Sequence, residues 1–308
     1  MKQRIITKPP APGTDGWART ITASKVPALL GISRFQSQYA AWHQLAGNLP
    51  VDGMDEDRAL WGHLSEEPLA KYWLHKHPGW QLNRPHNGTT EIAYSNPTLP
   101  FPNMATIDRR GINRKYGLKD PRRFHIIECK TAFSLEDWGT PDEDDSIPAD
   151  YFTQVTFQMG VSGIPSASVV VVSGAMKPEI HDVEFDEGIF TALVEQLHDI
   201  YRKIRAGEFP DLDADKKTYD AVRGLHPDID RDGTVQVPHD QAVAWLDAFH
   251  AEDEAKNRAQ LAKTQLAGLM GNAHLAMVGD QKLADRRARK NSTPSVYVNK
   301  KIDLSKEN

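Results

Sequence analysis

Apolar positions recur at helical spacing in the N-terminal part of the chain. Over residues 57–75, Leu69 and Trp73 fall on one stripe of a predicted helix. Glu66 lies on the same stripe, so a carboxylate is expected to face the core, where an unpaired charge is costly. Two shorter helices are predicted upstream, at 22–31 and 37–47, from their apolar spacing and their cap residues.

From about residue 91 onward, the pattern changes to short extended segments. Runs at 91–95, 103–108 and 124–130 are expected to form consecutive antiparallel strands. The run at 167–173 is almost continuously β-branched, which is typical of a strand buried on both faces. The other elements predicted here are a helix at 148–163, a strand at 180–185 and a helix at 186–206.

These elements predict an α/β core with a mixed central β-sheet flanked by helices, over residues 1–206. Residues 207–237 are dense in Asp, Gly, Pro and Lys without clear periodicity, which favours a linker or an irregular excursion. Residues 238–308 predict a helical C-terminal extension, with one long Ala-rich helix, two short strands near 275–278 and 295–298, and a disordered tail from about 300.

Composition narrows the class of protein further. A single cysteine in 308 residues excludes an intrachain disulfide framework, a zinc ribbon and a four-cysteine iron–sulfur cluster. The chain has no apolar run long enough to span a membrane and no signal-peptide pattern, so we expect a cytoplasmic protein without a membrane partner. The net charge of −5 argues weakly against bulk attraction to nucleic acid.

The strongest chemical signal is Asp108 followed by Glu128-Cys129-Lys130. Residues i and i+2 of a strand point to the same face, so Glu128 and Lys130 project together, and Asp108 joins them if its strand pairs alongside. Taken alone, Glu-x-Lys is most often a cross-strand ion pair on a solvated face. Here the surrounding strand is apolar on both faces, which favours partial burial of the pair.

Two carboxylates beside an ammonium group suit the metal-assisted hydrolysis of a phosphodiester. Hard oxygen ligands favour Mg²⁺, with Mn²⁺ as a substitute, and such a cation polarises the phosphoryl oxygen. Asp108 and Glu128 would bind the cation, and the carbonyl oxygen of Cys129 is a candidate third ligand. Lys130 would hold the attacking water and offset charge on the phosphate. If Glu66 reaches the cluster, a second cation becomes feasible.

At this point the sequence resembles the PD-(D/E)xK nucleases, and within them the phage recombination exonucleases of the lambda exonuclease and YqaJ-like type. The resemblance runs in order over residues 17–173, although Ile107 stands where the motif has Pro and Thr156 replaces the second Gln of a Gln-x-Gln. The blocks that carry it are Trp17–Ser24, Gly62–Glu66, Thr106–Asp108, Glu128–Lys130 and Tyr151–Gln158. It implies a restriction-endonuclease-like core.

The resemblance also implies roles for individual residues. Asp108 and Glu128 would be metal ligands, and Lys130 would be the catalytic lysine. Glu66 would be the helical acid beside the metals, and Gln154 would position the nucleophile or the metal-bound water. Ser24 and Arg19 resemble the family's 5′-phosphate pocket. A predicted helix N-terminus at Ser24 favours anion binding as well, with an ordinary N-cap as the alternative.

The implied function is hydrolysis of DNA from the 5′ ends of linear duplexes during phage or prophage recombination in a bacterial host cell. Implied partners are DNA, a single-strand annealing protein and further copies of the chain in a trimer. Two rivals stay open. One is an endonuclease or repair nuclease on the same scaffold, and the other is a DNA-binding recombination protein without turnover.

The segment between Asp108 and Glu128 is strongly basic, with Asp120 as its one acid. We expect a hairpin that contacts the DNA backbone, with a merely solvated charged loop as the alternative. Its basic residues are Arg109, Arg110, Arg114, Lys115, Lys119, Arg122 and Arg123. Histidines 63, 75 and 77 are interpreted as exposed helical residues rather than zinc ligands, because no cysteine partners accompany them.

Overall fold

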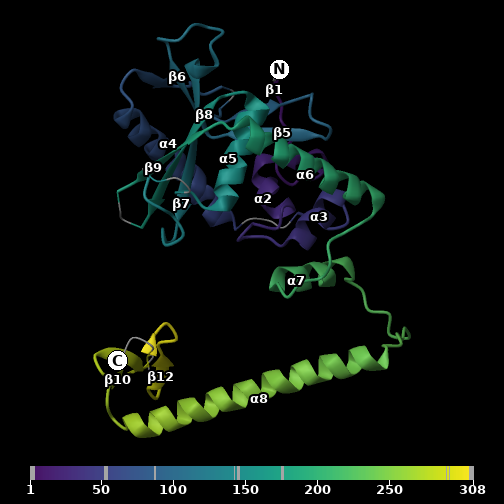
Figure 1. Ribbon diagram of the computed structural model, residues 1–308, viewed down its shortest axis with the longest axis vertical. Helices are drawn as coiled ribbons and strands as arrows, with labels where there is room; N and C mark the ends of the chain where they lie inside the picture. The colour runs from purple at the N-terminus through teal and green to yellow at the C-terminus, as the bar shows by residue number, and fades with distance from the viewer. Residues whose placement is uncertain are drawn as a thin grey trace. The chain divides into compact units, whose positions relative to one another are not determined.

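The computed structural model describes residues 4–51, 55–86, 88–141, 143, 146–174, 177–288, 290 and 292–304. The chain divides into two compact units, Met1–Ile229 and Asp230–Asn308 (Figure 1). The first unit therefore extends past the predicted core boundary at residue 206. It includes a helix, α7 (Lys216–Leu225), inside the segment that we interpreted as a linker or irregular excursion. Thr218 and Ala221 of this helix are buried, which explains why the segment folds with the core.

The described elements of the first unit, in chain order, are β1 (Arg4–Ile5), α1 (Asp15–Ala18), β2 (Ile21–Thr22), η1 (Ala23–Lys25), α2 (Val26–Leu29), α3 (Gln38–Ala46), α4 (Glu56–Lys76), β3 (Trp80–Leu82), β4 (Ile92–Ser95), β5 (Asn103–Ile107), β6 (Arg109–Asn113), η2 (Pro121–Arg123), β7 (Phe124–Ala132), α5 (Ala149–Ser162), β8 (Ser166–Ser173), β9 (Glu179–Glu184), α6 (Glu187–Ala206) and α7.

Two mixed sheets form the centre of this unit. The larger has the strand order β3-β6-β7-β8-β9, in which β7 and β8 run parallel and the other pairs are antiparallel. The smaller has the order β1-β4-β5-β2, in which β2 and β5 run parallel. The predicted mixed α/β fold with helices flanking the sheet is confirmed.

The neighbour of β7 differs from the prediction. Strands β5 and β7 were expected to pair directly, but β6 lies beside β7 and β5 belongs to the smaller sheet. Strand β6 reads Arg-Arg-Gly-Ile-Asn, which lacks the apolar alternation of a typical strand. Its backbone pairing with β7 and its packing under Trp73 and Trp80 hold it in the sheet, because both rings approach Gly111 closely.

The two faces of β7 contact different helices. Ile126 belongs to the main apolar core with Val155 and Phe157 of α5, whereas Ile127 packs with Leu69 and Trp73 of α4. Burial of each such side chain contributes about 1.5–3 kcal/mol, so the orientation of the strand is strongly fixed. By alternation, Glu128 points to the α5 face and Cys129 to the α4 face.

The ends of α4 and α5 are set by their capping residues. Helix α4 begins after Asp55, whose carboxylate accepts from the N–H of Arg58 at 2.9 Å. Helix α5 ends at Gly163, which has φ of 70° in the left-handed region that favours glycine. These two helices carry polar residues that contact the middle of β7.

The second unit consists of α8 (His239–Met270) followed by an antiparallel sheet. The sheet has the order β10-β11-β12, and Met270, Ala284 and Val296 form a small core between helix and sheet. The long helix and both predicted strands are present, and β11 lies between them. The three strands of this sheet are β10 (Leu275–Val278), β11 (Gln281–Arg287) and β12 (Ser295–Val298). Of the predicted tail, residues 305–308 lie outside the described part of the chain.

Within the described residues, none of the helices has both the length and the apolar character needed to cross a membrane.

Candidate metal centre

Asp108 sits at the junction of β5 and β6, directly beside the middle of β7. Arg109 pairs with Ile127 in the antiparallel register of β6 and β7, which places Asp108 next to Glu128. The N–H of Cys129 donates to Oδ2 of Asp108 at 2.8 Å. In a strand, the N–H and C=O of one residue point to the same edge, so the Cys129 carbonyl faces the Asp108 side as well.

Glu128 is held from three directions. Its side chain is 3% exposed, and its Oε1 accepts from Nζ of Lys130 and from Nε2 of Gln154, each at 2.6 Å. Its Oε2 accepts from Nε2 of Gln158 at 2.8 Å, and the same amide group donates to the carbonyl oxygen of Thr106 at 2.9 Å. These bonds fix the carboxylate at the α5 face, where β5, β7 and α5 meet.

Burial and negative charge define the electrostatics of this cluster. Burial raises the pKa of Asp108 well above its ordinary value, and the negative charge of Glu128 raises it further. Burial alone would lower the pKa of Lys130, but Glu128 and Asp108 outweigh that effect and raise it above the ordinary range. Lys130 is therefore a permanent cation, and the cluster favours additional positive charge near Asp108.

Glu66 reaches the cluster from α4. Its side chain is 16% exposed, and burial raises the pKa of its carboxyl group, an effect that His63 opposes and that Glu91 and Glu128 reinforce. Its backbone carbonyl accepts from Sγ of Cys129 at 3.5 Å. The structure therefore brings Asp108, Glu128, Lys130, Gln154 and Glu66 together around the middle of β7, as the sequence predicts.

The predicted phosphate pocket is not assembled in the same way. Ser24 lies in the short η1 segment, where its hydroxyl is 3.0 Å from that of Thr22, and α2 begins only at Val26. The guanidinium group of Arg19 packs against Gly47 at the end of α3, with Nη2 3.3 Å from the position a Cβ of Gly47 would take. In the described part of the chain, Arg19 and Ser24 therefore contact different residues, Gly47 and Thr22.

Lys25, the residue after Ser24, binds the backbone of the preceding segment. Its Nζ donates to the carbonyl oxygens of Trp17, Ala18 and Thr20 at 2.5, 2.9 and 3.0 Å. The same group lies 3.8 Å from the centre of the Trp17 ring. Lys25 therefore ties the end of α1 to η1 and is committed to the fold.

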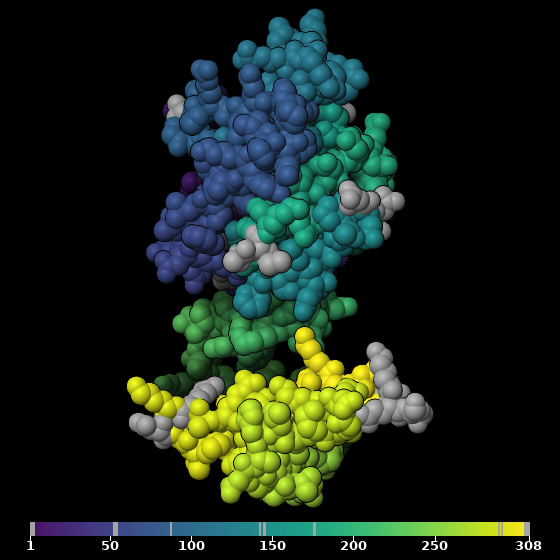
Figure 2. Space-filling model, turned by 90° about the vertical axis from the view of Figure 1, so that its left-hand side faces the viewer, coloured from purple at the N-terminus to yellow at the C-terminus, as the bar shows by residue number. Residues whose placement is uncertain are grey.

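The basic segment after Asp108 divides into a buried part and an exposed part. Arg109 is 5% exposed and forms an ion pair with Glu67, and Arg110 donates to the hydroxyl of Tyr94 at 2.9 Å. We predicted both arginines to bind DNA, but these contacts commit them to the interior of the fold. The exposed basic residues lie on the loop that joins β6 and β7 and protrudes from the unit: Arg114, Lys115, Lys119 and Arg122 (Figure 2).

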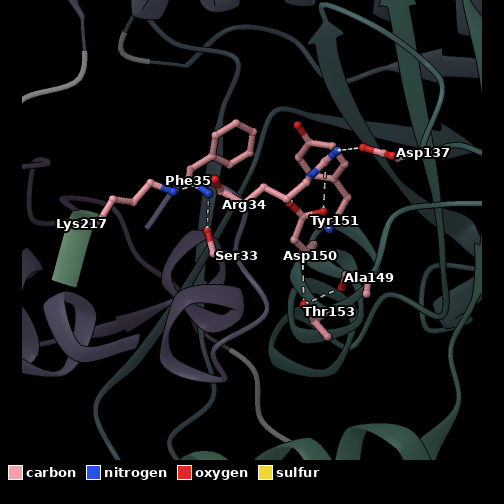
Figure 3. A network of polar contacts seen from close by, with 9 residues as sticks. All are labelled: Ser33, Arg34, Phe35, Asp137, Ala149, Asp150, Tyr151, Thr153 and Lys217. Atoms are coloured by element: carbon pink, nitrogen blue, oxygen red, sulfur yellow. Dashed lines mark hydrogen bonds and ion pairs between the residues drawn. The ribbon is translucent and has the colours of Figure 1, made fainter. Parts of the chain in front are cut away.

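Arg34 ties together the segments that flank the start of α5. Its guanidinium group donates to both oxygens of Asp150, at 3.0 and 3.2 Å, and to Asp137 at 3.2 Å (Figure 3). Its carbonyl oxygen accepts from Lys217 of α7 at 2.8 Å. The ring of Tyr151, the residue after Asp150, lies 5.3 Å from Nζ of Lys130. The network therefore anchors the helix turn that precedes Gln154.

Gln158 is a site residue that was not predicted, although it lies in the Tyr151–Gln158 block. The structure gives it two hydrogen bonds at the centre of the cluster, and it is fully buried. The signal was present in the sequence: Gln154 and Gln158 are four residues apart, so they lie on one face of a helix.

Comparison with known proteins bears on the N-terminal half of the chain. This part is a mixed α/β domain in which Glu128 and Lys130 of β7 lie beside Asp108 from the β5–β6 junction. A family model described as the YqaJ-like viral recombinase domain matches residues 16–165. This match confirms the resemblance of residues 16–165 to YqaJ-like proteins.

One curated relative and two solved structures illustrate the similarity. The chain is 22% identical over 320 residues to the uncharacterized protein YqaJ of Bacillus subtilis (strain 168), covering 96% of this chain and 93% of that protein. An alkaline exonuclease of Laribacter hongkongensis, LHK-Exo, aligns with 62% of this chain and 90% of its own, at 14% identity and a TM-score of 0.44. LHK-Exo in complex with dAMP aligns over the same shares, at 16% identity and a TM-score of 0.43.

Proposed function

We propose that this protein is a metal-dependent deoxyribonuclease that uses Mg²⁺, with Mn²⁺ as a substitute. The observation that carries the proposal is the meeting of the Asp108 and Glu128 carboxylates with the ammonium group of Lys130 beside the middle of β7. Two acids and one amine in a buried cluster match the needs of phosphodiester hydrolysis better than those of a structural ion pair, which would need a single acid.

The residues present fit a hard divalent cation. Asp108 and Glu128 supply carboxylate oxygens, and the Cys129 carbonyl lies along the same strand edge. Burial and the charge of Glu128 raise the pKa of Asp108, and this crowding of negative charge supports the proposal of a cation here. Glu66 adds a further carboxylate from the other side of β7 for a second cation.

When bound, the cation would polarise the phosphoryl oxygen and make hydroxide available near neutral pH. The chain's own residues supply the rest. Lys130 stays protonated and can donate to a phosphate oxygen as charge develops there. Gln154 and Gln158 hold both oxygens of Glu128, so its orientation is set before substrate arrives. The Arg34 network keeps the start of α5 in place behind them.

The proposed substrate is linear duplex DNA, degraded from its 5′ ends during phage or prophage recombination. The match to a viral recombinase domain supports this setting, and the exposed basic loop between β6 and β7 offers contacts to the DNA backbone. A single-strand annealing partner and a homotrimer belong to the same proposal, from the resemblance alone. Because Arg19 packs against Gly47, the end-binding pocket needs its own test.

The activity is tested with linear and closed circular duplex DNA in millimolar Mg²⁺. We expect Asp108→Asn and Lys130→Met to slow digestion of linear DNA at least about 100-fold, because each removes a group that acts on the reacting phosphate. Lys76→Met, which removes an exposed lysine from the end of α4, is the matched control and should cut at the wild-type rate. Wild-type rates in the Asp108 and Lys130 variants would refute the proposal.

The same assay separates the exonuclease from its rivals. An exonuclease leaves closed circles intact and cuts 5′-phosphorylated ends faster than dephosphorylated ends if Ser24 and Arg19 bind the phosphate. Cutting of closed circles would assign an endonuclease on the same scaffold. Binding of DNA without any cleavage in Mg²⁺ or Mn²⁺ would assign a DNA-binding recombination protein.

A further inference from the structure

A second group of potential metal ligands joins α4 to the segment before β4. His63 and Glu66 are one helical turn apart, and Nδ1 of His63 is 2.9 Å from Oε1 of Glu66. Glu91 comes from a distant part of the chain, immediately before β4. One ligand atom from each of the three side chains lies within 4.8 Å of the others.

The separation of these atoms suits a single cation. Metal bonds to imidazole nitrogen and carboxylate oxygen are about 2.0–2.6 Å long, so two ligands of one cation lie at most about 4–5 Å apart. The three side chains already meet this limit in the described structure, without movement of the backbone. Two of them come from a rigid helix turn, which leaves Glu91 as the ligand supplied by the opposite segment.

The charge of the group also favours a cation. Glu66 and Glu91 are two carboxylates held close together, and Glu66 faces the negative charge of Glu128 as well. Like charges at this distance repel one another, and a single imidazole offsets them only when it is protonated. A divalent cation would neutralise both carboxylates while leaving the imidazole neutral, as metal coordination requires.

We propose that His63, Glu66 and Glu91 form a binding site for a divalent transition-metal cation, separate from the site at Asp108 and Glu128. An imidazole ligand disfavours Mg²⁺ and Ca²⁺ and favours first-row transition metals, for which Mn²⁺ is a suitable probe. Glu66 is the residue common to both clusters. A cation on the His63 side holds the Glu66 carboxylate there, which limits its reach toward Asp108.

The site can be tested by binding alone, so its failure would not be confused with failure of the proposed nuclease. Mn²⁺ is titrated into the full chain and followed by electron paramagnetic resonance, in a background of millimolar Mg²⁺ that occupies the all-oxygen site. We expect the wild-type protein to bind Mn²⁺ under these conditions at the site formed by His63, Glu66 and Glu91. The same binding should persist in Asp108→Asn, because that residue belongs to the other cluster.

Two substitutions in the site and one outside it complete the test. His63→Gln and Glu91→Gln should each weaken Mn²⁺ binding at least about 10-fold, since each removes a direct ligand. His75→Gln, which removes another exposed histidine of α4, is the matched control and should bind as the wild type does. His63 is exposed, so its loss should leave the unfolding midpoint unchanged. Equal affinity in the His63, Glu91 and His75 variants would overturn the proposal.

Discussion

Gly160 provides the sharpest test of how α5 is packed. It lies two residues after Gln158, and a Cβ built on it would meet the ring of Phe190 in α6 at 2.1, 2.3 and 2.4 Å. Ordinary contacts between carbon atoms are about 3.5–4.0 Å, so Gly160→Ala requires the ring or the helix to move by more than about 1 Å. Both lie in the main apolar core, where overpacking of this kind costs about 1–3 kcal/mol.

The matched control is Gly62→Ala in α4. A Cβ at Gly62 has nothing within 4 Å, so this variant gains only the helix propensity of alanine, up to about 1 kcal/mol. Gly160→Ala receives the same gain, and the difference in unfolding free energy between the two variants therefore isolates the clash. We expect a difference of about 1–3 kcal/mol in favour of Gly62→Ala, measured by urea unfolding.

A double-mutant cycle assigns the cost to its cause. In a Phe190→Leu background the ring is absent. Gly160→Ala should then lower the free energy of unfolding by at least about 0.5 kcal/mol less than it does in the wild-type background. If Gly160→Ala is as stable as Gly62→Ala, then α5 does not approach α6 this closely. The positions of Gln154 and Gln158 behind Glu128 would then need revision, because the same helix carries them.

Two further predictions concern buried polar groups. Burial lowers the pKa of His125 from 6.5 to about 4, and its ring lies between the hydroxyls of Ser166 and Ser168. The unfolded chain therefore protonates the His125 imidazole more readily than the folded chain does. Above pH 6.5 this difference should not affect the free energy of unfolding, and as the pH falls to 4 it should lower that free energy by up to about 3 kcal/mol. Urea unfolding across this range should show that His125→Gln loses less free energy of unfolding on acidification than the wild type does. Equal losses in the two proteins would contradict the assigned burial of His125. Gln158→Leu removes the donor to Glu128 and should cost about 1–3 kcal/mol at neutral pH, and an unchanged unfolding midpoint would show that the Glu128 carboxylate does not depend on it.

The centre of the site follows from short-range rules that the sequence displays. Alternation along a strand puts Glu128 and Lys130 on one face, and helical spacing puts Glu66 on the stripe of Leu69 and Trp73. Both rules depend only on local geometry. The apolar residues on both faces of the strand indicate that these charges are partly buried, and the structure agrees with the predicted cluster.

Other parts of the site depend on partners that local pattern does not reveal. Arg109 and Arg110 look like exposed cations in a basic run, but Glu67 and Tyr94, both distant in sequence, bind them in the interior. The group formed by His63, Glu66 and Glu91 also joins residues from separate segments. A single sequence without aligned relatives gives no measure of such pairings.

The same limit applies to whole elements. Strand β6 carries few apolar residues, and its place in the sheet is set by hydrogen bonds to β7. Helix α7 lies in a segment dense in turn-forming residues. It has only 10 residues, so its apolar face is too short to give a clear helical periodicity in the sequence. In both cases the tertiary neighbours decide the structure, whereas the local composition favours a loop.

The position of Cys129 gives this chain a built-in chemical reporter. It is the only cysteine in the sequence, and burial together with the nearby carboxylates raises the pKa of its thiol well above the ordinary value. Because the thiolate is the reactive form, alkylation should be slow while α4 stays closed over β7. The rate of labelling by one thiol reagent would thus measure how often that helix and strand separate, without introducing any foreign group into the protein.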